Sequence, residues 1–435
     1  MATSEKAAYD ALPYPRVVVV GGGFAGLAVV NGLAGKPYKV LLIDKQNHHC
    51  FQPLLYQVAT ASLGADSIAH PFRRTVGPMS NVAFRMAAVK KVDPANKQVI
   101  TDRGTYDYDI LVLATGTVTN FFGMEDCERT AMQLKTIGQA LDIRSDFLQE
   151  FETAVALDDV EEQRRYLSFV IVGAGPTGVE LAGALAEIKR SVVKHEYREM
   201  DNETMQIVLI DSNDKVLKNF NEASSDRALT YLQELGVNVR LNTRVVGLED
   251  DELMLNDGSS IRTNTVIWAA GVRGASVPGM EAAMDPRSGR YRVDPQNAVE
   301  GMPDVYAIGD IAAMRNEEWG DGHPQVAQVA LQQGDHLVKN LVRKAEGKEA
   351  LPFTYKHQGS MAVIGRYRAV VDLGQRSFGG FFAWLVWMFV HVVQLVDFRN
   401  RFMVLFNWGW KYLSWRNTIR LIIRPYVRRT NIRLR

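Results

Sequence analysis

The chain has 435 residues, of which 47% are hydrophobic and 23% charged, and its 50 Lys and Arg nearly balance 49 Asp and Glu. This length allows two or three folded domains, and the composition excludes collagen-like, low-complexity and largely disordered proteins. Cys50 and Cys127 are too few for a disulfide framework and lack the spacing of a zinc site. We therefore expect a reducing compartment and no metal site.

The near-zero net charge conceals an uneven distribution. Residues 397–435 carry ten Lys and Arg against one acid, whereas the other 396 residues carry 40 bases against 48 acids. A basic, aromatic tail on an acidic body indicates a negatively charged partner, either a membrane or a nucleic acid. Residues 1–15 contain no apolar segment of the secretory type, so we expect no signal peptide.

The first predicted element is an apolar strand at residues 16–20, which runs into the glycine-rich sequence GGGFAG. A helix of small residues follows to about Ala34, and residues 40–44 form the next strand, which ends in Asp44. Such a unit needs glycines for a tight turn, for close approach to a pyrophosphate and for helix–strand packing, and these are Gly21, Gly23 and Gly26. The helix N-terminus can bind phosphate and the carboxylate a ribose, so the unit predicts a dinucleotide site.

The same unit recurs in the middle of the chain. A strand at residues 168–172 leads into GAGPTG and a helix through Glu187, and residues 207–211 form the strand that ends in Asp211. The matching glycines are Gly173, Gly175 and Gly178. The charged stretch 188–203 lengthens the unit, either as a longer helix or as an insertion. An acid at the strand end repels a 2′-phosphate, which favours NADH over NADPH.

Two further strand-to-glycine segments, residues 109–116 and 265–271, bracket the second unit. We therefore expect the second domain to be inserted in the first. Strands that alternate with helices predict an α/β fold with parallel sheets. The expected domains are residues 14–120 together with 270–350, residues 121–269, and a C-terminal region at 351–435.

The segment 306–310 reads as a strand that ends in Gly309 and Asp310, followed by a helix-like start at residues 311–313. A carboxylate at this place can bind a ribityl chain, and a helix start can face a pyrophosphate. Together with the first glycine unit, the segment points to a flavin.

The last part of the chain changes character. Residues 354–373 read as strands with a turn at Gly365, and 380–396 are apolar except for His391 and Gln394, a length at the short edge of a spanning helix. Two apolar stripes at helical spacing follow, opposite a basic stripe: Phe402, Leu405, Phe406 and Gly409; Trp415, Ile419, Ile422 and Ile423; and Arg416, Arg420 and Arg424. Five of the seven tryptophans lie here, at Trp384, Trp387, Trp408, Trp410 and Trp415. This pattern is typical of helices that lie in the membrane interface, which disfavours nucleic acid and leaves a dimer interface as the alternative.

These pieces in this order resemble the flavoprotein superfamily with two dinucleotide-binding domains of the glutathione reductase type, over residues 14–345. The turn at Ala114–Gly116 and the Gly309–Asp310 pair match its recurrent motifs. The resemblance implies two Rossmann-like domains, the first binding FAD and the second NAD(P)H. Disulfide reductases of this fold carry a cysteine pair after the first unit, whereas Cys50 stands alone, and sulfide:quinone oxidoreductases need later cysteines than Cys127.

The finer resemblance is to the type II NADH:quinone oxidoreductases, the respiratory NADH dehydrogenases that do not pump protons. It lies in the sequences NHHCFQPLLYQVA at 47–59, VGAGPTGVELA at 172–182 and AQVALQ at 327–332. The resemblance implies that Glu180 lies near nicotinamide and flavin, and that Gln328 lies near the isoalloxazine and the quinone head. Leu331 occupies the position where some relatives carry a histidine, so we do not expect histidine-based proton delivery there. The resemblance also implies that His48 and His49 lie in a structural loop.

The resemblance and the motifs together give the candidate site. Glu180 and Gln328 are the expected catalytic residues, and Gln328 and Gln332 the expected quinone residues. Non-covalent FAD is expected at Gly21, Gly23, Phe24, Ala25, Gly26, Asp44, Lys45, Val89, Ala114, Thr115, Gly116, Gly309, Asp310, Ala327 and Gln328. NADH is expected at Gly173, Gly175, Pro176, Thr177, Gly178, Glu180, Asp211, Ala270 and Gly271.

The sequence therefore predicts a peripheral membrane flavoenzyme that passes electrons from NADH through FAD to a membrane quinone, without pumping protons. Residues 379–435 are expected to bind an anionic membrane, on the cytoplasmic side of the cell inner membrane, and a homodimer is possible. One alternative is a soluble-acceptor NADH oxidoreductase whose C-terminal helices dimerise. Another is an assembly or signalling factor that binds flavin and NADH without turnover.

Overall fold

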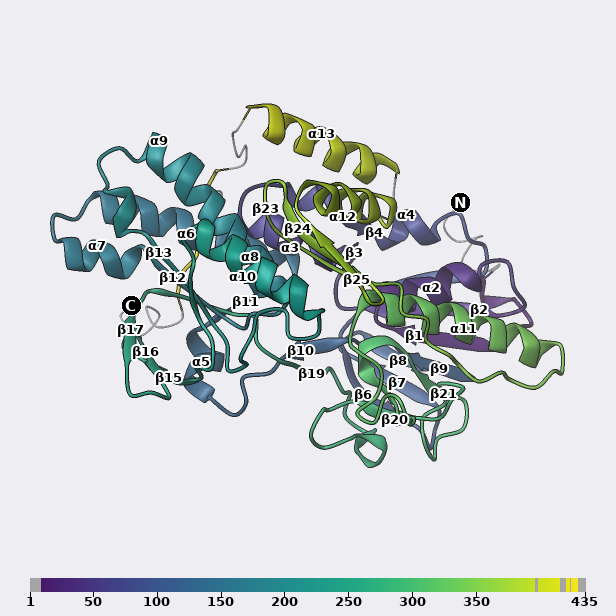
Figure 1. The fold of residues 1–435 in the computed structure, drawn as a ribbon. Coiled ribbons are helices and arrows are strands. Elements are labelled where there is room, and N and C mark those ends of the chain that lie inside the picture. The colour runs from purple at the N-terminus through teal and green to yellow at the C-terminus, as the bar shows by residue number, and fades with distance from the viewer. Residues whose placement is uncertain (1–8, 396–397, 415–419, 423, 429–435) are drawn as a thin grey trace. The chain divides into compact units, whose positions relative to one another are not determined.

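The structure is a computed structural model that describes residues 9–395, 398–414, 420–422 and 424–428. The chain forms two compact units, whose helices and strands are labelled in Figure 1. Unit 1 comprises Met1–His49, His70–Val118 and Val272–His357, and unit 2 comprises Cys50–Ala69, Thr119–Gly271 and Gln358–Arg435. Both units are therefore built from segments that are far apart in the sequence.

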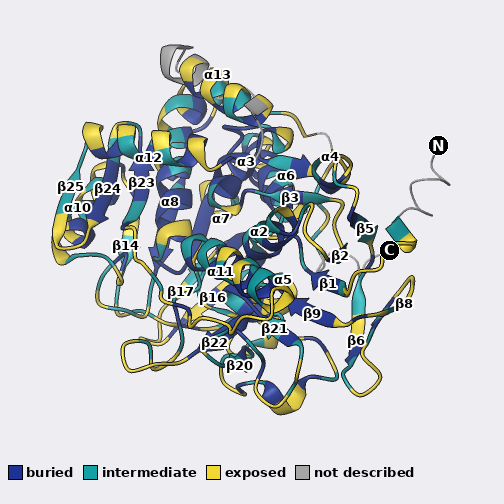
Figure 2. Cartoon of the chain, turned by 90° about the vertical axis from the view of Figure 1, so that its right-hand side faces the viewer, coloured by how far each residue is buried: buried dark blue, intermediate teal, exposed yellow. Residues whose placement is uncertain are grey.

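Unit 1 is built on a five-stranded parallel sheet with the strand order β21-β9-β1-β2-β5. Its strands are β1 (Arg16–Val20), β2 (Lys39–Asp44), β5 (Val82–Met86), β9 (Ile110–Leu113) and β21 (Val305–Ala307). A parallel sheet covered on both faces needs strands that are apolar along their length, and Figure 2 shows β1 and β9 as buried. The strands predicted at 16–20 and 40–44 are confirmed.

Alternate side chains of β1 point to opposite faces of this sheet. On one face, Val17 and Val19 share a hydrophobic cluster with α2 (Phe24–Gly32) and α11 (Ala327–Ala345). On the other face, Val18 and Val20 pack with the antiparallel sheet of β6 (Val89–Asp93), β7 (Gln98–Thr101) and β8 (Gly104–Asp107). The carboxyl end of β1 and the start of α2 are thereby held on a rigid core.

The segment after Asp310 differs from the prediction. One 3-10 turn, η6 (Gly309–Ile311), leads into the strand β22 (Ala312–Met314), which pairs with β20 (Tyr291–Val293). The helix predicted to start at residue 311 is wrong, because the whole of β22 is buried and strand pairing overrides the helix propensity of its alanines.

Unit 2 contains a second five-stranded parallel sheet, with the order β11-β18-β12-β13-β14. Its strands are β11 (Met132–Gln133), β12 (Ser168–Val172), β13 (Gln206–Ile210), β14 (Asn238–Arg240) and β18 (Thr265–Trp268). The main helices of this part of the unit are α6 (Ile137–Val155), α7 (Val160–Tyr166), α8 (Pro176–Ile188) and α10 (Glu222–Glu234). An antiparallel sheet of β15 (Val245–Glu249), β16 (Glu252–Leu255) and β17 (Ser260–Arg262) completes it.

The helix α8 continues past its predicted end. It passes through a π-helical turn at Lys189–Val193 into α9 (Lys194–Glu196), so the charged stretch after residue 187 begins as a lengthened helix. In its middle, a Cβ on Gly183 would lie 1.7 Å from the carbonyl oxygen of Ile364. Only a glycine at this position allows α8 to lie directly against the C-terminal sheet of the same unit.

That C-terminal sheet consists of β23 (Ser360–Gly365), β24 (Arg368–Leu373) and β25 (Arg376–Gly379), and it confirms the strands predicted within residues 354–373. The helices α12 (Phe381–Val393) and α13 (Phe398–Ser414) follow. In the described part of the chain, we find no helix with the length and apolar character needed to cross a membrane.

The basic stripe predicted for residues 416–424 does not form a free surface in the residues of it that the structure describes. Residues 420–422 and 424–428 form no helix. Arg420 lies 2.7 Å from Glu196 and Arg424 lies 2.5 Å from Asp142, both acids of unit 2. The prediction of an amphipathic helix is therefore wrong for these residues, whose arginines pair with acids of unit 2. Trp415, Arg416, Ile419 and Ile423 lie outside the described residues.

Candidate functional site

The first glycine loop joins β1 to α2 in unit 1 and leaves one position open. Gly21 has a φ of +100°, and a Cβ on Gly26 would lie 1.9 Å from the carbonyl oxygen of Gly21. In contrast, a Cβ on Gly23 would meet no heavy atom within 4 Å. Steric need inside the protein therefore explains Gly21 and Gly26 but not Gly23, whose position is open to a close-lying ligand such as a pyrophosphate.

The carboxylate of Asp44 closes this loop from the end of β2. It accepts hydrogen bonds from the backbone N–H of Gly22 at 2.7 Å and of Gln46 at 2.7 Å. Burial raises the pKa of this carboxyl, and the two N–H donors oppose that shift. Lys45 follows directly, and Val89 begins β6 in the same unit.

Buried polar atoms without a partner among the described residues also occur in unit 1. Three of them belong to residues next to this glycine loop or to the turn at Gly309: Nε2 of His49, Oγ1 of Thr115 and Nε2 of Gln333. Buried polar atoms normally have a hydrogen-bond partner, so an unpaired set near a glycine loop fits a polar ligand. The residues present therefore fit FAD.

Gln333 is a site residue that the sequence motifs do not reveal. Its side chain is fully buried, and its Oε1 accepts the backbone N–H of Gly309 at 2.7 Å. Gly309 has a φ of +71°, which is costly for other residues, so Gln333 fixes the turn that carries Asp310. Its signal in the sequence is only that it adjoins Gln332.

The two predicted quinone residues have different surroundings on α11. Oε1 of Gln328 accepts a hydrogen bond from the hydroxyl of Tyr355 at 3.3 Å. The amide of Gln332 is used at both ends by the backbone of Lys356, donating at 2.9 Å and accepting at 3.0 Å. Gln332 thus holds the chain after α11, and its role toward a quinone stays a prediction.

The glycine loop of unit 2 repeats the same construction between β12 and α8. Gly173 has a φ of +109°, and a Cβ on Gly178 would lie 1.8 Å from its carbonyl oxygen. A Cβ on Gly175 would again meet nothing within 4 Å. Asp211 accepts the backbone N–H of Ala174 at 2.5 Å, as Asp44 does for Gly22. Unit 2 therefore offers a second open phosphate position.

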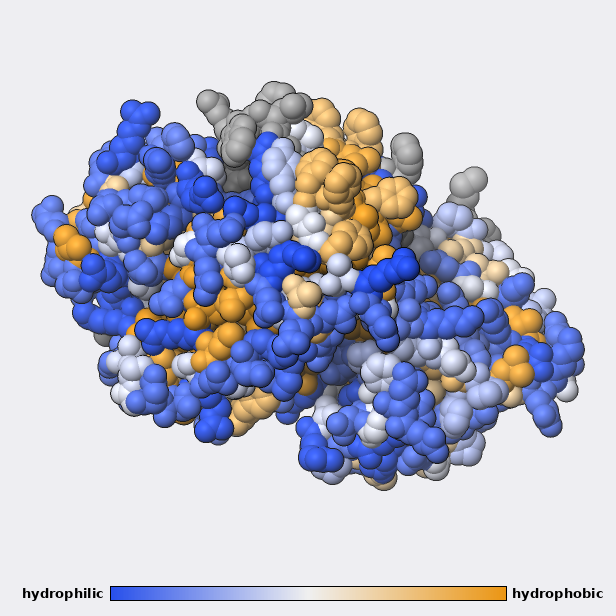
Figure 3. All heavy atoms as spheres, viewed as in Figure 1, coloured by the Kyte–Doolittle hydropathy of each residue, from blue (hydrophilic) through white to orange (hydrophobic). Residues whose placement is uncertain are grey.

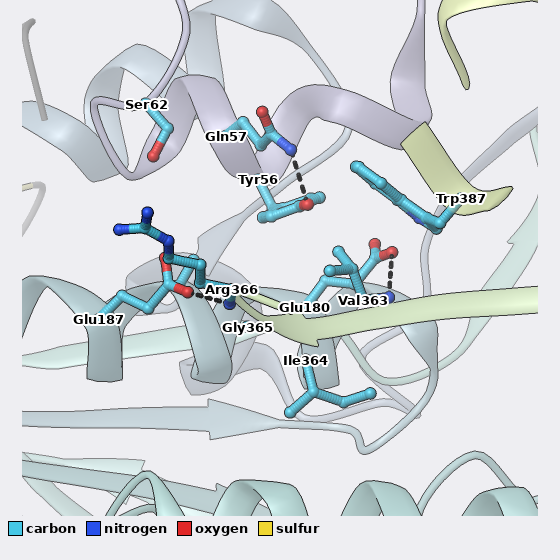
Figure 4. Close-up of a pocket in the computed structure, with 11 residues that line it drawn as sticks. Tyr56, Gln57, Ser62, Glu180, Glu187, Val363, Ile364, Gly365, Arg366 and Trp387 are labelled. Atoms are coloured by element: carbon cyan, nitrogen blue, oxygen red, sulfur yellow. Dashed lines mark hydrogen bonds between the residues drawn. The ribbon is translucent and has the colours of Figure 1, made fainter. Parts of the chain in front are cut away.

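Glu180 lies in the second turn of α8, in the wall of a small cavity of about 30 Å³ within unit 2. Its carboxylate accepts the backbone N–H of Val363 at 3.4 Å, as Figure 4 shows. Burial raises the pKa of Glu180 to about 8. A carboxyl in this environment holds its proton at neutral pH and can give it up or take it back near that pH.

Three other residues line this cavity close to Glu180. Tyr56 and Gln57 come from α3 (Leu55–Ala59), and the Gln57 amide donates to the Tyr56 hydroxyl at 2.8 Å. Trp387 of α12 lines the cavity close to Glu180 (Figure 4). His391 stacks on this indole with ring centroids 4.2 Å apart, and burial lowers its pKa to about 4.

The helix α13 reaches the same place through Trp408. Its indole donates to Oε1 of Gln57 at 2.8 Å, and its ring lies 5.4 Å from that of Trp387. Both C-terminal helices therefore contact the wall of the Glu180 cavity. The sequence gives only a weak signal of this, since Tyr56 and Gln57 lie in the 47–59 motif without an assigned role.

The thiols and the histidine pair take no visible part in this chemistry. Burial raises the pKa of Cys50 to about 12 and that of Cys127 to about 11, so both stay protonated at neutral pH. His49 is buried, and its Nδ1 lies 3.0 Å from the carbonyl oxygen of Gly22. That contact suits the structural role expected for the loop.

Comparison with known proteins agrees with this arrangement. A family model described as pyridine nucleotide-disulphide oxidoreductase matches residues 15–334, and one described as NDH2 C-terminal domain matches residues 357–417. The type II NADH:quinone oxidoreductase Ndh of Mycobacterium tuberculosis is 34% identical over 417 residues, covering 92% of this chain and 89% of the relative. The internal alternative NAD(P)H-ubiquinone oxidoreductase A1 of Arabidopsis thaliana is 31% identical over 445 residues, covering 94% and 86%. The solved structure of NDH2 from Plasmodium falciparum in complex with NADH has a TM-score of 0.86 at 21% identity and covers 94% of this chain and 100% of that one, which shows the shared fold.

Two glycine-lined nucleotide positions on parallel sheets define a flavoprotein with two dinucleotide-binding domains, the class of the pyridine nucleotide-disulphide oxidoreductases. Cys50 is half-buried and Cys127 is buried, and both thiols are protonated at neutral pH, which is unlike a redox pair. Within that class, the chain belongs to the type II NADH:quinone oxidoreductases, the NDH2 family.

Proposed function

We propose that the chain works at a membrane surface as a type II NADH:quinone oxidoreductase, with its reaction centred on Glu180 and Gln328. NADH is oxidised and quinone is reduced by two electrons, without proton pumping. When bound, FAD would supply the hydride acceptor for NADH and the electron donor for the quinone. The observation that carries this function is the pair of open glycine positions, Gly23 in unit 1 and Gly175 in unit 2.

The residues of the chain would bind FAD and NADH, orient the quinone and supply a proton. The open loop at Gly23, with Asp44, would hold the pyrophosphate and ribose of FAD, and the loop at Gly175 would hold NADH. Gln328 can offer both a donor and an acceptor to a quinone oxygen or a flavin ring. Glu180 would hold a proton for the reaction.

Gln328→Ala is expected to lower the rate of quinone reduction by about ten- to a hundredfold, because a hydrogen bond to a reacting oxygen contributes about 1.5–3 kcal/mol. The flavin content and the NADH-to-ferricyanide rate should stay normal, since ferricyanide takes electrons without a protein hydrogen bond. The measurement is NADH oxidation with a soluble quinone analogue against ferricyanide, with the exposed Lys339→Ala on the same helix as control. A normal quinone rate in Gln328→Ala would remove this residue from the proposed site.

The membrane surface is proposed from an exposed apolar face on α12 and α13, visible as an orange patch over these helices in Figure 3. Its most exposed members are Phe382 at 74%, Phe389 at 71% and Phe402 at 60%. A contiguous apolar patch rimmed by polar residues is typical of a membrane-binding site. Since quinone dissolves in the membrane, we place the enzyme on the cytoplasmic face of the inner membrane, where NADH is available.

Replacing Phe382 and Phe389 together by serine is expected to weaken binding to phospholipid vesicles by at least about a hundredfold. Burying one phenylalanine contributes about 1.5–3 kcal/mol, and both side chains are lost. Co-sedimentation with vesicles measures this, and Val160→Ser, an exposed apolar residue of α7, is the control. If vesicle binding persists while gel filtration shows a dimer turned into a monomer, the face is a homodimer interface instead.

A further inference from the structure

The face of α8 that carries Glu180 also carries a second carboxylate. Glu180, Ala184 and Glu187 are spaced by four and three residues, so they lie on one face of the helix, and all three line the same cavity. With a volume of about 30 Å³, the cavity has room for about one or two water molecules. Two carboxyl groups thus share a small polar space with only an alanine between them.

The two carboxyl groups differ in their access to solvent. Glu180 is buried between Val363 and Trp387, whereas Glu187 is half-buried beside Arg366, whose backbone N–H donates to its Oε1. Figure 4 shows Glu187 and the Arg366 side chain at one end of the cavity and Glu180 at the other. The cavity therefore leads from a partly exposed acid to a buried acid.

The reaction needs such a connection. Oxidation of NADH by a quinone, NADH + H⁺ + Q → NAD⁺ + QH₂, takes up one proton from solvent in each turnover. The raised pKa of Glu180 makes it a proton donor at neutral pH, but a donor must be reprotonated before it acts again. The wall around Glu180 also contains Tyr56 and Gln57, but Glu187 is the one other carboxylic acid among the residues that line the cavity.

We propose that Glu187 is the solvent-side entrance of a proton relay, which reprotonates Glu180 through water held in this cavity. In one passage, Glu187 takes a proton from solvent and gives it to a water molecule in the cavity, and that water gives one of its own protons to the Glu180 carboxylate. One proton enters and no electrons move. Ala184 keeps the route open because its side chain is small. This relay rests on the role proposed above for Glu180.

The test compares two acceptors with opposite proton demands. Glu187→Gln and Ala184→Leu should each lower the quinone-reduction rate by about tenfold and raise its solvent isotope effect. The ferricyanide rate should not change, because that reaction releases a proton instead of consuming one. Formate, a small carboxylic acid, should restore the rate of Glu187→Gln. Glu222→Gln, an exposed acid at the start of α10, is the matched control.

Three results would overturn the relay: a normal quinone rate in Glu187→Gln, a ferricyanide rate that falls in parallel, or no response to formate. Glu180→Gln separates this failure from failure of the role proposed for Glu180. If Glu180→Gln impairs quinone reduction and Glu187→Gln does not, only the relay is wrong. If Glu180→Gln also leaves quinone reduction normal, the proposed role of Glu180 is wrong.

Discussion

Gly23→Ala is expected to weaken FAD binding while leaving unit 1 folded. The backbone at Gly23 has a φ of −71°, which alanine adopts readily, and the new methyl group would meet no protein atom within 4 Å. The methyl group would instead occupy the space in which we place the pyrophosphate. Overpacking of this kind costs about 1–3 kcal/mol, so FAD affinity should fall by about ten- to a hundredfold. The flavin-to-protein absorbance ratio and a titration of the apoprotein with FAD measure the loss.

The second glycine loop supplies the matched experiment. Gly175→Ala has the same backbone geometry and the same open surroundings in unit 2, so it should weaken NADH binding and leave the flavin content normal. Gly320→Ala, an exposed glycine with nothing within 4 Å of its added methyl group, controls for the substitution itself. Full flavin content in Gly23→Ala, or flavin loss in Gly175→Ala, would contradict the assignment of the two loops.

These two loops could be predicted from the sequence because the residues that such a loop requires lie close together in the chain. A buried strand, three spaced glycines and an acid at the end of the next strand all fall within one supersecondary unit, and the structure places Asp44 and Asp211 on the corresponding backbone N–H groups. The strand before each loop is also apolar after its first residue, which identifies it without any knowledge of the partner strands.

The surroundings of Glu180 could not be predicted from the sequence in this way. The hydrogen bond between Gln57 and Trp408 joins residues 351 positions apart, and no periodicity in either segment specifies the other. The same holds for Val363, which lies 183 residues from Glu180. Long-range contacts of this kind depend on how the C-terminal sheet packs on α8, a packing that Gly183 permits but does not encode.

The C-terminal basic segment shows a different limit, since its charge is visible in the sequence but its partner is not. Arg428 lies 3.0 Å from Asp146 and 2.7 Å from Glu150, two acids of α6 with side chains 3% and 9% exposed. Tyr426 is held beside it by its backbone, which donates to Gln149 at 2.6 Å and accepts at 3.1 Å. The end of the described chain is therefore fastened to the nucleotide-binding part of unit 2 by a buried ionic cluster.

Arg428→Gln is expected to lower the free energy of unfolding by about 3–5 kcal/mol above neutral pH, because it leaves two buried carboxylates without a counter-charge. Arg424→Gln should cost less than about 1 kcal/mol, since Arg424 is 75% exposed in its pair with Asp142. Urea titrations followed by tryptophan fluorescence measure both variants. A loss in Arg428→Gln as small as that in Arg424→Gln would mean that solvent reaches the cluster.

The pH dependence of this loss follows from the two acids. Burial raises the pKa of Asp146, and it raises that of Glu150 from 4.5 to about 7, while the Arg428 charge opposes both shifts. A carboxyl with a raised pKa binds more protons in the folded than in the unfolded protein, so its contribution to stability is lost as the pH rises through the folded pKa. Without Arg428 the pKa values of Asp146 and Glu150 in the folded protein rise further. Above these pKa values the two ionised carboxylates then lower the free energy of unfolding more than they do when Arg428 is present. The stability difference between the unsubstituted protein and Arg428→Gln should therefore be large at about pH 8 and shrink toward about pH 5, where Glu150 is protonated in the folded protein. An equal difference at the two pH values would show that the arginine stabilises the segment by packing and not by charge.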